Sequence, residues 1–193
     1  APPEPQPDCP LCPRLVEFRE GNREAYPAYF NGAAPSFGDP NARLLIVGLA
    51  PGLHGANRTA RPFTGDYAGD LLYATLAKFG FSSGTYKADP GDGLTLKDAM
   101  ITNAVRCVRI SALPRLEAIL CLGRIAHDSA LAALGVKPKD APFAHGAAHP
   151  VNQAGLNLFD SYHCSRYNTN TRRLTPEMFE SVFAAIAAKI GKG

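Results

Sequence analysis

One glycine-rich stretch contains most of the residues that could do chemistry: GLAPGLHGANRTARPFTGD, which spans Gly48–Asp66. Its glycines allow the backbone to approach a ligand closely. The Asp66 carboxylate could orient a water molecule or stabilise a positive charge, and Phe63 could offer a flat surface to a ligand or pack in a core. Asp66 also stands directly before an expected helix, where an aspartate commonly caps the first turn, and the two roles are compatible.

Two further candidates follow apolar segments. Asn103 offers a donor and an acceptor to a ligand, or alternatively satisfies nearby backbone groups. A neutral imidazole at His163 could donate a hydrogen bond to a developing anion, although a single histidine is more often a surface or core residue. The polar segment after it, which contains Ser165, Arg166 and Asn168, suits phosphate contacts or a solvated turn.

The five cysteines are Cys9, Cys12, Cys107, Cys121 and Cys164. In an intracellular protein the default expectation is reduced, mostly buried thiols. Cys9 and Cys12 form a CxxC pair, for which zinc, a redox pair and coincidence are competing explanations. The spacing alone therefore leaves the role of this pair open.

Strands and helices alternate along the chain, which predicts a three-layer α/β/α sandwich with a central, mostly parallel four-stranded sheet. The expected strands are four apolar segments: residues 42–50, 99–105, 116–123 and 156–162. The expected helices are a short amphipathic helix after Cys12 and residues 67–79, 124–134 and 176–190. We expect residues 1–8 to be a flexible tail and residues 9–193 a single domain. Because ligands bind at the carboxyl edge of parallel strands, the loops that follow three of these strands should form one site.

The composition limits the classes of function. With 20 Lys and Arg against 17 Asp and Glu, the net charge of +3 permits a local basic groove but is low for a protein that coats nucleic acid. No apolar run is long enough to cross a bilayer and no secretory leader is evident, so we expect no membrane association and a cytoplasmic location. The first loop lacks the GxGxxG and GxxxxGK[ST] patterns, which argues against a Rossmann-like nucleotide enzyme.

Together these segments resemble the uracil-DNA glycosylase superfamily, and specifically its type B branch, also called family 5. The similarity is carried by GLAPG…HGANRTARPFTGD, ITNAVRC (residues 101–107), LPRLEAILCLGRIAHDSAL (113–131) and LFDSYHCSRYNTNT…LT (158–175), with CPLCPRLV near the start. These segments follow the order of the family and cover most of the chain. The resemblance implies an enzyme that removes uracil from DNA and leaves an abasic site, with hypoxanthine and other deaminated bases as further expected substrates.

In such enzymes the base must leave the duplex before its N-glycosidic bond can be broken. The resemblance implies that Asp66 orients the attacking water and stabilises the sugar cation, while His163 stabilises the departing base anion. The groups expected around the base are the Phe63 ring as a stacking surface, Asn103, His54 and the backbone amides of Gly48, Ala50 and Gly52. The residues expected to contact DNA are Arg58, Ser165, Arg166 and Asn168.

Three departures bear on specificity and reaction type. Leu49 stands where a neighbouring branch of the superfamily carries an acidic residue, so we expect a roomier base pocket. No motif places a lysine that could form a Schiff base, so we expect a monofunctional glycosylase without lyase activity. Some type B members lack an amide at the position of Asn103, and we do not treat it as essential.

The resemblance also implies a 4Fe–4S cluster with Cys9, Cys12 and Cys107 as three of its four thiolate ligands. The fourth ligand is not identified in this chain. After Cys107 the sequence passes directly to RISALPRL, as if a loop and helix of roughly twenty residues were missing. Cys121 could substitute, but its apolar strand predicts a buried thiol; we favour a missing segment instead. The expected role of the cluster is structural, and Cys164 is expected to be a packed thiol.

The expected partner is DNA that contains uracil or another deaminated base. We expect a monomer, and no sequence feature supports a sliding clamp as a protein partner. A second hypothesis from a different class is a non-catalytic binder of damaged DNA on the same scaffold, because a fold alone proves no function. Such a protein would bind uracil-containing DNA without releasing the base.

Overall fold

The computed structural model describes residues 5–105, 113–151 and 155–192. Cys107, one of the three predicted cluster ligands, lies outside these residues. The division into a tail of residues 1–8 and one domain of residues 9–193 stays a prediction. Within the described part of the tail, the carbonyl oxygen of Pro7 accepts a hydrogen bond from the amide of Ala33 at 3.1 Å.

Four parallel strands form the centre of the main sheet, in the order β5 (Ala99–Asn103), β2 (Leu44–Gly48), β6 (Ala118–Leu122) and β8 (Asn157–Ser161). Every residue of β2 and β6 is buried, as expected where both faces of a parallel sheet are covered. Two antiparallel strands complete the edges: β1 (Phe37–Gly38) beside β5, and β7 (Ala148–Pro150) beside β8. The sheet thus has six strands, and the predicted number of four was wrong. Strands of two and three residues are too short to show a hydrophobic period in the sequence.

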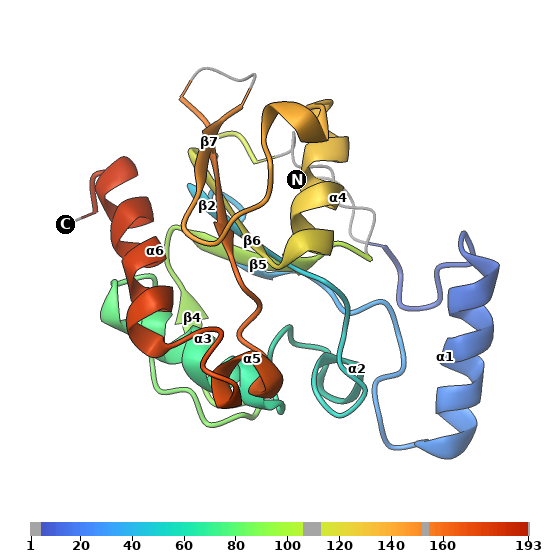
Figure 1. Ribbon diagram of the computed structural model, residues 1–193. Coiled ribbons are helices and arrows are strands. Elements are labelled where there is room, and N and C mark those ends of the chain that lie inside the picture. The colour runs from blue at the N-terminus through green and yellow to red at the C-terminus, as the bar shows by residue number, and fades with distance from the viewer. Residues whose placement is uncertain (1–4, 106–112, 152–154, 193) are drawn as a thin grey trace.

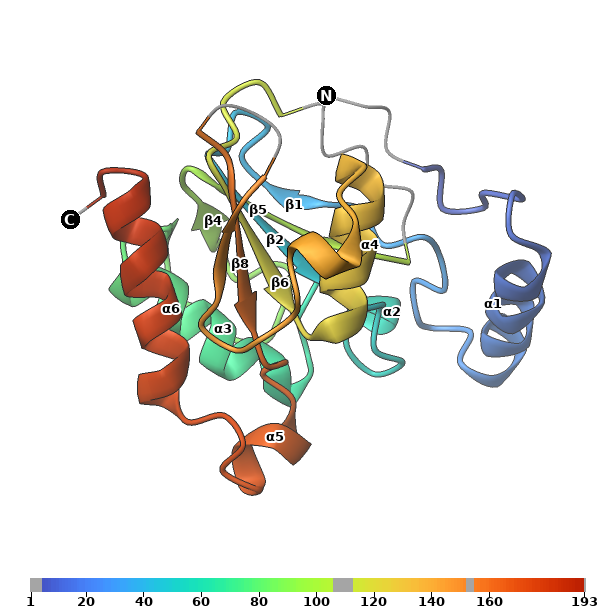
Figure 2. The same cartoon turned by 45° about the horizontal axis from the view of Figure 1, so that its top comes forward.

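Helices cover both faces of the sheet, which confirms the predicted three-layer α/β/α sandwich (Figure 1). The α4 helix (Arg124–Leu134) covers one face, and α3 (Tyr67–Lys78) and α6 (Pro176–Lys189) cover the other (Figure 2). Successive side chains of β2 alternate between these layers. Ile46 packs in the cluster on the α3 and α6 side, whereas Val47 packs in the cluster on the α4 side.

The remaining elements are short or peripheral. The α1 helix (Pro13–Ala25) lies to one side of the sandwich, and only its Asn22 is buried (Figure 1). The other elements are α2 (Ala56–Thr59), α5 (Arg166–Asn170), a 3₁₀ turn (Pro138–Asp140) and a two-stranded sheet of β3 (Ser82–Ser83) and β4 (Thr95–Leu96). No helix in the described ranges is both long enough and apolar enough to span a membrane.

Capping residues place the long helices where the sequence predicts them. The Asp66 carboxylate accepts a hydrogen bond from the amide of Gly69 and begins α3, and Thr175 does the same for the amide of Met178 in α6. The expected helix at 124–134 matches α4, which ends at Gly135 in the left-handed conformation typical of a C-terminal glycine. Because β2, β5 and β8 run parallel in the sheet, the loops that follow them leave the same edge, as predicted.

Candidate active site

Gly48 brings two of the predicted substrate-binding side chains together. Its strand partner across the β2–β5 pairing is Asn103. A Cβ atom at Gly48 would lie 2.6 Å from Oδ1 of Asn103 and 2.7 Å from Cζ of Phe63, closer than real Cβ contacts. Only a glycine therefore allows the amide and the aromatic ring to meet at the end of β2. Asn103 is buried, and among the described residues no group makes a hydrogen bond to its carboxamide, so a ligand could use both its donor and its acceptor.

Phe63 is held in an unusual backbone conformation. Its φ of 53° lies in the left-handed region, which costs a non-glycine residue on the order of 1–2 kcal/mol. The side chain is buried, and its ring stacks on that of His163 with 5.8 Å between centroids and 30° between planes. The two residues come from the loops after β2 and β8, so the structure brings together what the sequence separates by a hundred residues.

Asp66 combines helix capping with an enclosed carboxylate. Oδ1 accepts a hydrogen bond from the amide of Gly69 at 3.3 Å. Oδ2 lies against two glycines, because a Cβ at Gly52 or Gly55 would lie 3.2 or 2.3 Å from it. Burial raises the pKa of Asp66, while the amide of Gly69 and the nearby His163 act in the opposite direction. The glycines of the first motif thus leave the space that this carboxylate occupies.

His163 faces Asp66 from the end of β8. Burial lowers the pKa of His163, and the Asp66 charge opposes that shift. The imidazole is therefore neutral near pH 7, the form that can donate one hydrogen bond without giving up a proton. The amide nitrogen of the Asn168 side chain donates to the His163 carbonyl at 2.9 Å, and Ser165 caps α5, so this short helix braces the loop.

A carboxylate, a neutral imidazole, a free amide and an aromatic ring therefore meet at one edge of the sheet. The carboxylate can stabilise a developing positive charge and orient a water molecule, and the imidazole can stabilise a developing negative charge. The amides of Ala50 and Gly52 also have no acceptor among the described residues, and both residues are exposed. They remain available to a ligand.

Other predicted site residues have different surroundings. The exposed His54 packs against Tyr26 and Tyr29, and its Nδ1 lies 3.0 Å from the Tyr29 hydroxyl. Arg58 is exposed, and its Nε donates to the carbonyl of His54 at 3.0 Å. Arg166 is exposed, with its guanidinium 5.2 Å from the centre of the Tyr67 ring. The side-chain donor of Asn168 is used inside the protein, so this residue supports the loop, and its contact with DNA stays a prediction.

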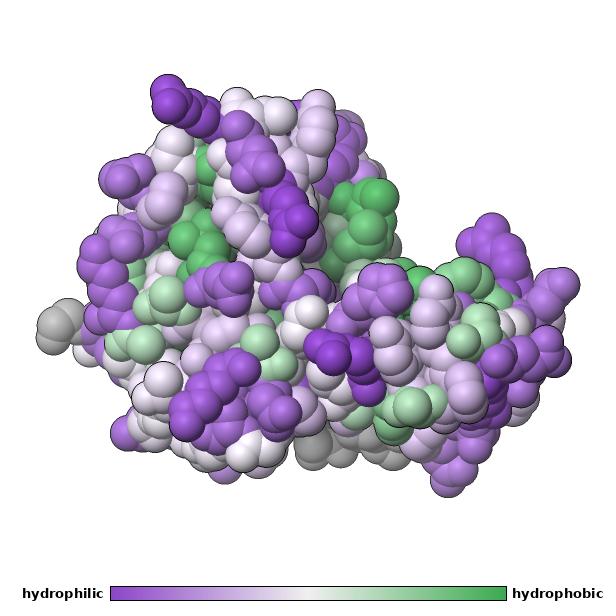
Figure 3. Space-filling model, turned by 90° about the horizontal axis from the view of Figure 1, so that it is seen from below, coloured by the Kyte–Doolittle hydropathy of each residue, from purple (hydrophilic) through white to green (hydrophobic). Residues whose placement is uncertain are grey.

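The two N-terminal cysteines border a separate cavity of about 210 Å³ between α1 and the first-motif loop. Figure 3 shows apolar side chains gathered where the lobe that carries α1 meets the main body. Apolar atoms dominate the lining, yet Nε of Arg19 and Nδ2 of Asn22 are buried there without a hydrogen-bond partner in the described part of the chain. Val105, two residues before Cys107, lines the same cavity.

The other two described cysteines are packed in the core. Cys121 is fully buried in β6, and burial raises the pKa of its thiol, which disfavours the thiolate that a metal requires. Cys164 is also fully buried, and burial raises its pKa to about 12, in agreement with the predicted packed thiol. Within residues 5–105, 113–151 and 155–192, no group of three or more His, Cys, Asp or Glu side chains is arranged to hold a metal ion.

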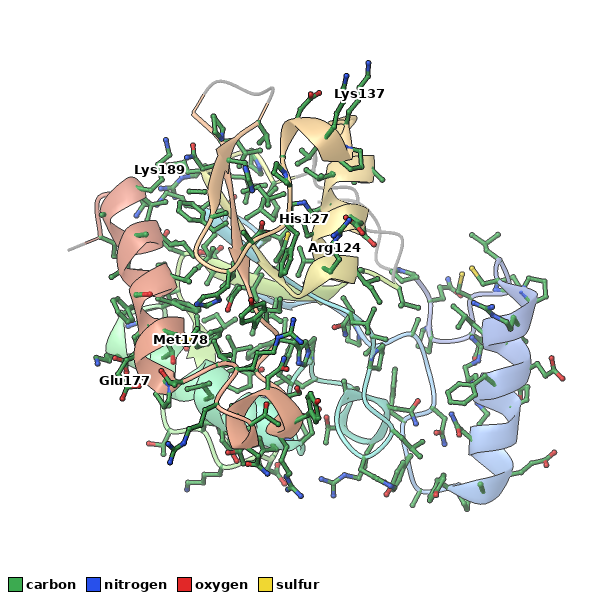
Figure 4. The ribbon with its side chains drawn as sticks, in the orientation of Figure 1. Arg124, His127, Lys137, Glu177, Met178 and Lys189 are labelled. Atoms are coloured by element: carbon green, nitrogen blue, oxygen red, sulfur yellow. The ribbon has the colours of Figure 1, made fainter. Side chains whose placement is uncertain are left out.

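Two buried ion pairs were not predicted from the sequence. Arg61 pairs with Asp92 behind the first-motif loop, at 2.8 Å. His127 pairs with Asp160 between α4 and β8, with 2.7 Å between Nδ1 and Oδ1. Figure 4 shows His127 on the side of α4 that faces the sheet. For the second pair the sequence offers one signal, Asp160 inside the apolar segment of β8, and that signal does not identify its partner; Arg61 and Asp92 lie in polar, turn-rich segments.

Comparison with known proteins shows the family of this chain. The family model described as "Uracil DNA glycosylase superfamily" matches residues 35–187. The chain therefore belongs to the uracil DNA glycosylase superfamily. It is 44% identical to the type-5 uracil-DNA glycosylase of Thermus thermophilus over 199 residues, which covers 90% of each chain. It is 36% identical to the type-5 enzyme of Pyrobaculum aerophilum over 207 residues, with 95% of this chain and 90% of the relative covered.

These alignments also bear on the length of the chain. The alignment with the Thermus thermophilus protein runs over 199 positions, more than the 193 residues of this chain. The relative therefore has residues within the aligned region that this chain lacks. That difference agrees with the expected missing segment, although the alignment length does not locate it.

Proposed function

We propose that this protein is a uracil-DNA glycosylase that hydrolyses the N-glycosidic bond of a uracil rotated out of DNA and leaves an abasic site. One observation carries the proposal: Asp66 and Phe63, from the loop after β2, lie beside His163, from the loop after β8, at the carboxyl edge of the sheet. The family and the names of its type-5 relatives support the same reaction.

In the proposed reaction, Asp66 orients a water molecule toward C1′ of the sugar. Its negative charge stabilises the oxocarbenium-like sugar as the C–N bond breaks. The bonding electrons move to the base, and the neutral His163 donates a hydrogen bond to the uracil O2 on which negative charge develops. The water oxygen then bonds to C1′, and the proton that it loses passes by way of the solvent to N1 of the uracil anion. The products are free uracil and an abasic site.

Base recognition is assigned to the groups around Gly48. The Phe63 ring supplies the stacking surface, and the Asn103 carboxamide, which makes no hydrogen bond to another described residue, matches the O4 and N3–H edge of uracil. The exposed amides of Ala50 and Gly52 supply further donors. Leu49 is 39% exposed and carries no charge that would reject a larger base, so hypoxanthine is a proposed second substrate. The function assigned to Arg58, Arg166 and Ser165 is to contact the DNA backbone.

The cavity beside α1 is the proposed site of a 4Fe–4S cluster. The residues present fit it in part, because two thiols border one cavity that also contains two N–H donors, Arg19 Nε and Asn22 Nδ2, that make no hydrogen bond to any described residue. Cys9 and Cys12 would hold the cluster together with Cys107, and a fourth ligand is not assigned. Iron–thiolate bonds would tie the N-terminal segment to the domain when the cluster is bound. This structural role is separate from the chemistry at Asp66.

The decisive experiment is base release from end-labelled oligonucleotides that contain one uracil, one hypoxanthine or only normal bases, followed by alkaline cleavage. We expect strand breaks at uracil, and also at hypoxanthine, after alkali, and none without alkali because lyase activity is not expected. Binding to uracil-containing DNA without any base release would support a non-catalytic binder and overturn the proposal. A monomeric state and an intracellular location stay predictions.

A further inference from the structure

A buried cation lies directly behind the first-motif loop. The guanidinium of Arg61 makes two hydrogen bonds to the carboxylate of Asp92, both at 2.8 Å, and neither side chain is appreciably exposed. Its Nε donates to the Thr64 hydroxyl at 2.7 Å. The rings of Phe37, Tyr73 and Tyr86 surround the cation, with their centres 5.2–5.9 Å from it. These contacts neutralise and fix a charge that would otherwise be costly to bury.

Two tyrosines of this aromatic group donate hydrogen bonds from their hydroxyls to consecutive backbone carbonyls of the loop. Tyr73 donates to the carbonyl of Pro62 at 2.7 Å, and Tyr86 donates to the carbonyl of Phe63 at 3.1 Å. The two rings stack with 4.5 Å between centroids. Burial raises the pKa of Tyr86, so its hydroxyl keeps the proton that it donates.

Asp92 connects the segment that carries Tyr86 to the first-motif loop. It accepts the amide of Lys87, the residue after Tyr86, at 3.0 Å, while it also holds Arg61. The segment between β3 and β4 is thereby fastened to the residue two positions before Phe63. The hydrogen bond to Arg61 holds the pKa of Asp92 well below its ordinary value, so the pair stays charged.

Gly69 shows how close this contact is. A Cβ at this position would lie 2.0 Å from the Phe63 carbonyl oxygen and 2.4 Å from the Tyr86 hydroxyl. The same glycine donates its amide to the Asp66 carboxylate. One residue of α3 therefore contacts both the carbonyl of the stacking residue and the proposed catalytic carboxylate.

We propose that Tyr86 is a positioning residue for base recognition: its hydroxyl holds the Phe63 peptide in the left-handed conformation that presents the ring beside His163 and Asn103. The proposal rests on the proposed function. The strained Phe63 peptide needs a fixed partner, and the Tyr86 hydroxyl is the group that contacts its carbonyl. Loss of the hydroxyl should weaken the binding of the extruded base without weakening the contacts to the DNA backbone.

The test compares two duplexes by fluorescence anisotropy. One carries a 2′-fluorinated deoxyuridine, in which the fluorine disfavours the sugar cation and so prevents cleavage; the other carries an abasic analogue without a base. The ratio of their affinities measures how strongly the protein holds the base. We expect Tyr86→Phe to lower this preference by about fivefold to tenfold, the effect of one hydrogen bond, with abasic-site affinity unchanged.

Thr75→Val is the matched control. It removes another buried hydroxyl that donates to a carbonyl, that of Leu71 within α3, at 2.8 Å. Both variants should lose similar thermal stability, but only Tyr86→Phe should change the preference for the base. Gly69→Ala, whose Cβ would displace the same hydrogen bond, should reproduce the Tyr86→Phe effect.

The outcomes separate this inference from the function on which it rests. A third duplex, with thymidine at the same position, tests the function itself: a wild-type protein that binds it as tightly as the fluorinated deoxyuridine would overturn both. If the wild type discriminates against thymidine, and Tyr86→Phe keeps the wild-type ratio of affinities for the fluorinated deoxyuridine and the abasic analogue, the positioning role is wrong while the function stands. An equal loss of preference in Thr75→Val would show a general effect of destabilisation, and would also overturn the role of Tyr86.

Discussion

The rings of Phe63 and His163 stack on each other at an angle of 30°, with 5.8 Å between their centroids. A base inserted between them would need about 7 Å, two layers at ordinary van der Waals separation. The base can therefore stack on Phe63 only if one ring moves aside or if His163 meets the base with its edge. The His163 loop, which is held by Asn168 and α5, must therefore accommodate both the free protein and the protein with a base stacked on Phe63.

Asp66→Asn should strongly reduce activity without destabilising the fold. Removal of the charge should lower the rate of uracil release by about 10²–10⁴-fold, since the water is no longer oriented and the cation no longer stabilised. Asparagine still caps α3, and it relieves the cost of a buried carboxylate. The melting temperature should therefore stay equal or rise near pH 7. Asp70→Asn, in the exposed first turn of the same helix, is the matched control and should retain activity within about twofold.

The stability gain of Asp66→Asn should depend on pH. Because burial raises the pKa of Asp66, its ionisation costs the folded state more than the unfolded state. Wild-type stability at this site is thus highest at low pH and falls as pH rises through the raised pKa. The difference in melting temperature between variant and wild type should shrink as the pH falls toward about 4. A difference that grows on acidification would contradict the assigned direction.

The rate of uracil release should also fall in acid, as Asp66 becomes protonated. The inflection should lie above the ordinary value of 3.8, because burial raises the pKa of this carboxyl. His163 acts in the opposite direction, so His163→Asn should lower the rate and move the inflection to higher pH. Single-turnover rates across about pH 4–8 would measure both effects. An inflection that moves to lower pH in His163→Asn would rule out this coupling.

Arg166→Ala should weaken DNA binding uniformly across sequences. If the exposed guanidinium contacts a phosphate, the slope of log affinity against log salt should become shallower by about one. Lys137→Ala is the control, because Lys137 lies at the far end of the molecule from α5 (Figures 1 and 4). Equal salt slopes for Arg166→Ala and the wild type would remove Arg166 from the DNA interface.

Cysteine substitutions test the proposed cluster without using activity as the readout. Cys9→Ser and Cys12→Ser should each reduce bound iron and sulfide and remove the visible absorption of an anaerobically purified protein. Cys121→Ala should retain both, since its thiol is buried within β6. Loss of iron in Cys121→Ala would identify this residue as the fourth ligand and overturn our assignment.

The His127–Asp160 pair should contribute to stability. Nδ1 of His127 contacts Asp160, and Nε2 lies 2.9 Å from the carbonyl of Ala141. His127→Ala would leave the Asp160 carboxylate buried with weaker compensation, which typically costs about 3–5 kcal/mol of unfolding free energy. Asp128→Ala, in the exposed pair with Arg124, should change it by about 0.5 kcal/mol or less. Denaturant unfolding measures both variants.

Local patterns were sufficient for much of the fold. The buried run of β2 and the capping residues Asp66 and Thr175 depend on hydrophobicity and on hydrogen bonds to nearby amides, and both can be inferred from neighbouring residues. The alternation of strands and helices likewise predicts the parallel centre of the sheet. The family motifs add the identities of the candidate site residues, because their order and spacing are specific.

Only the tertiary structure decided which of these residues meet and how. The sequence by itself determined the layered fold, the main helix boundaries and the candidate residues Asp66, Phe63, Asn103 and His163. It could not show the Phe63–His163 contact or the Tyr86 hydrogen bond, because each joins loops whose approach depends on how the whole sheet packs. The same holds for the two edge strands and the Arg61–Asp92 pair, since contacts between distant segments follow from the assembled core.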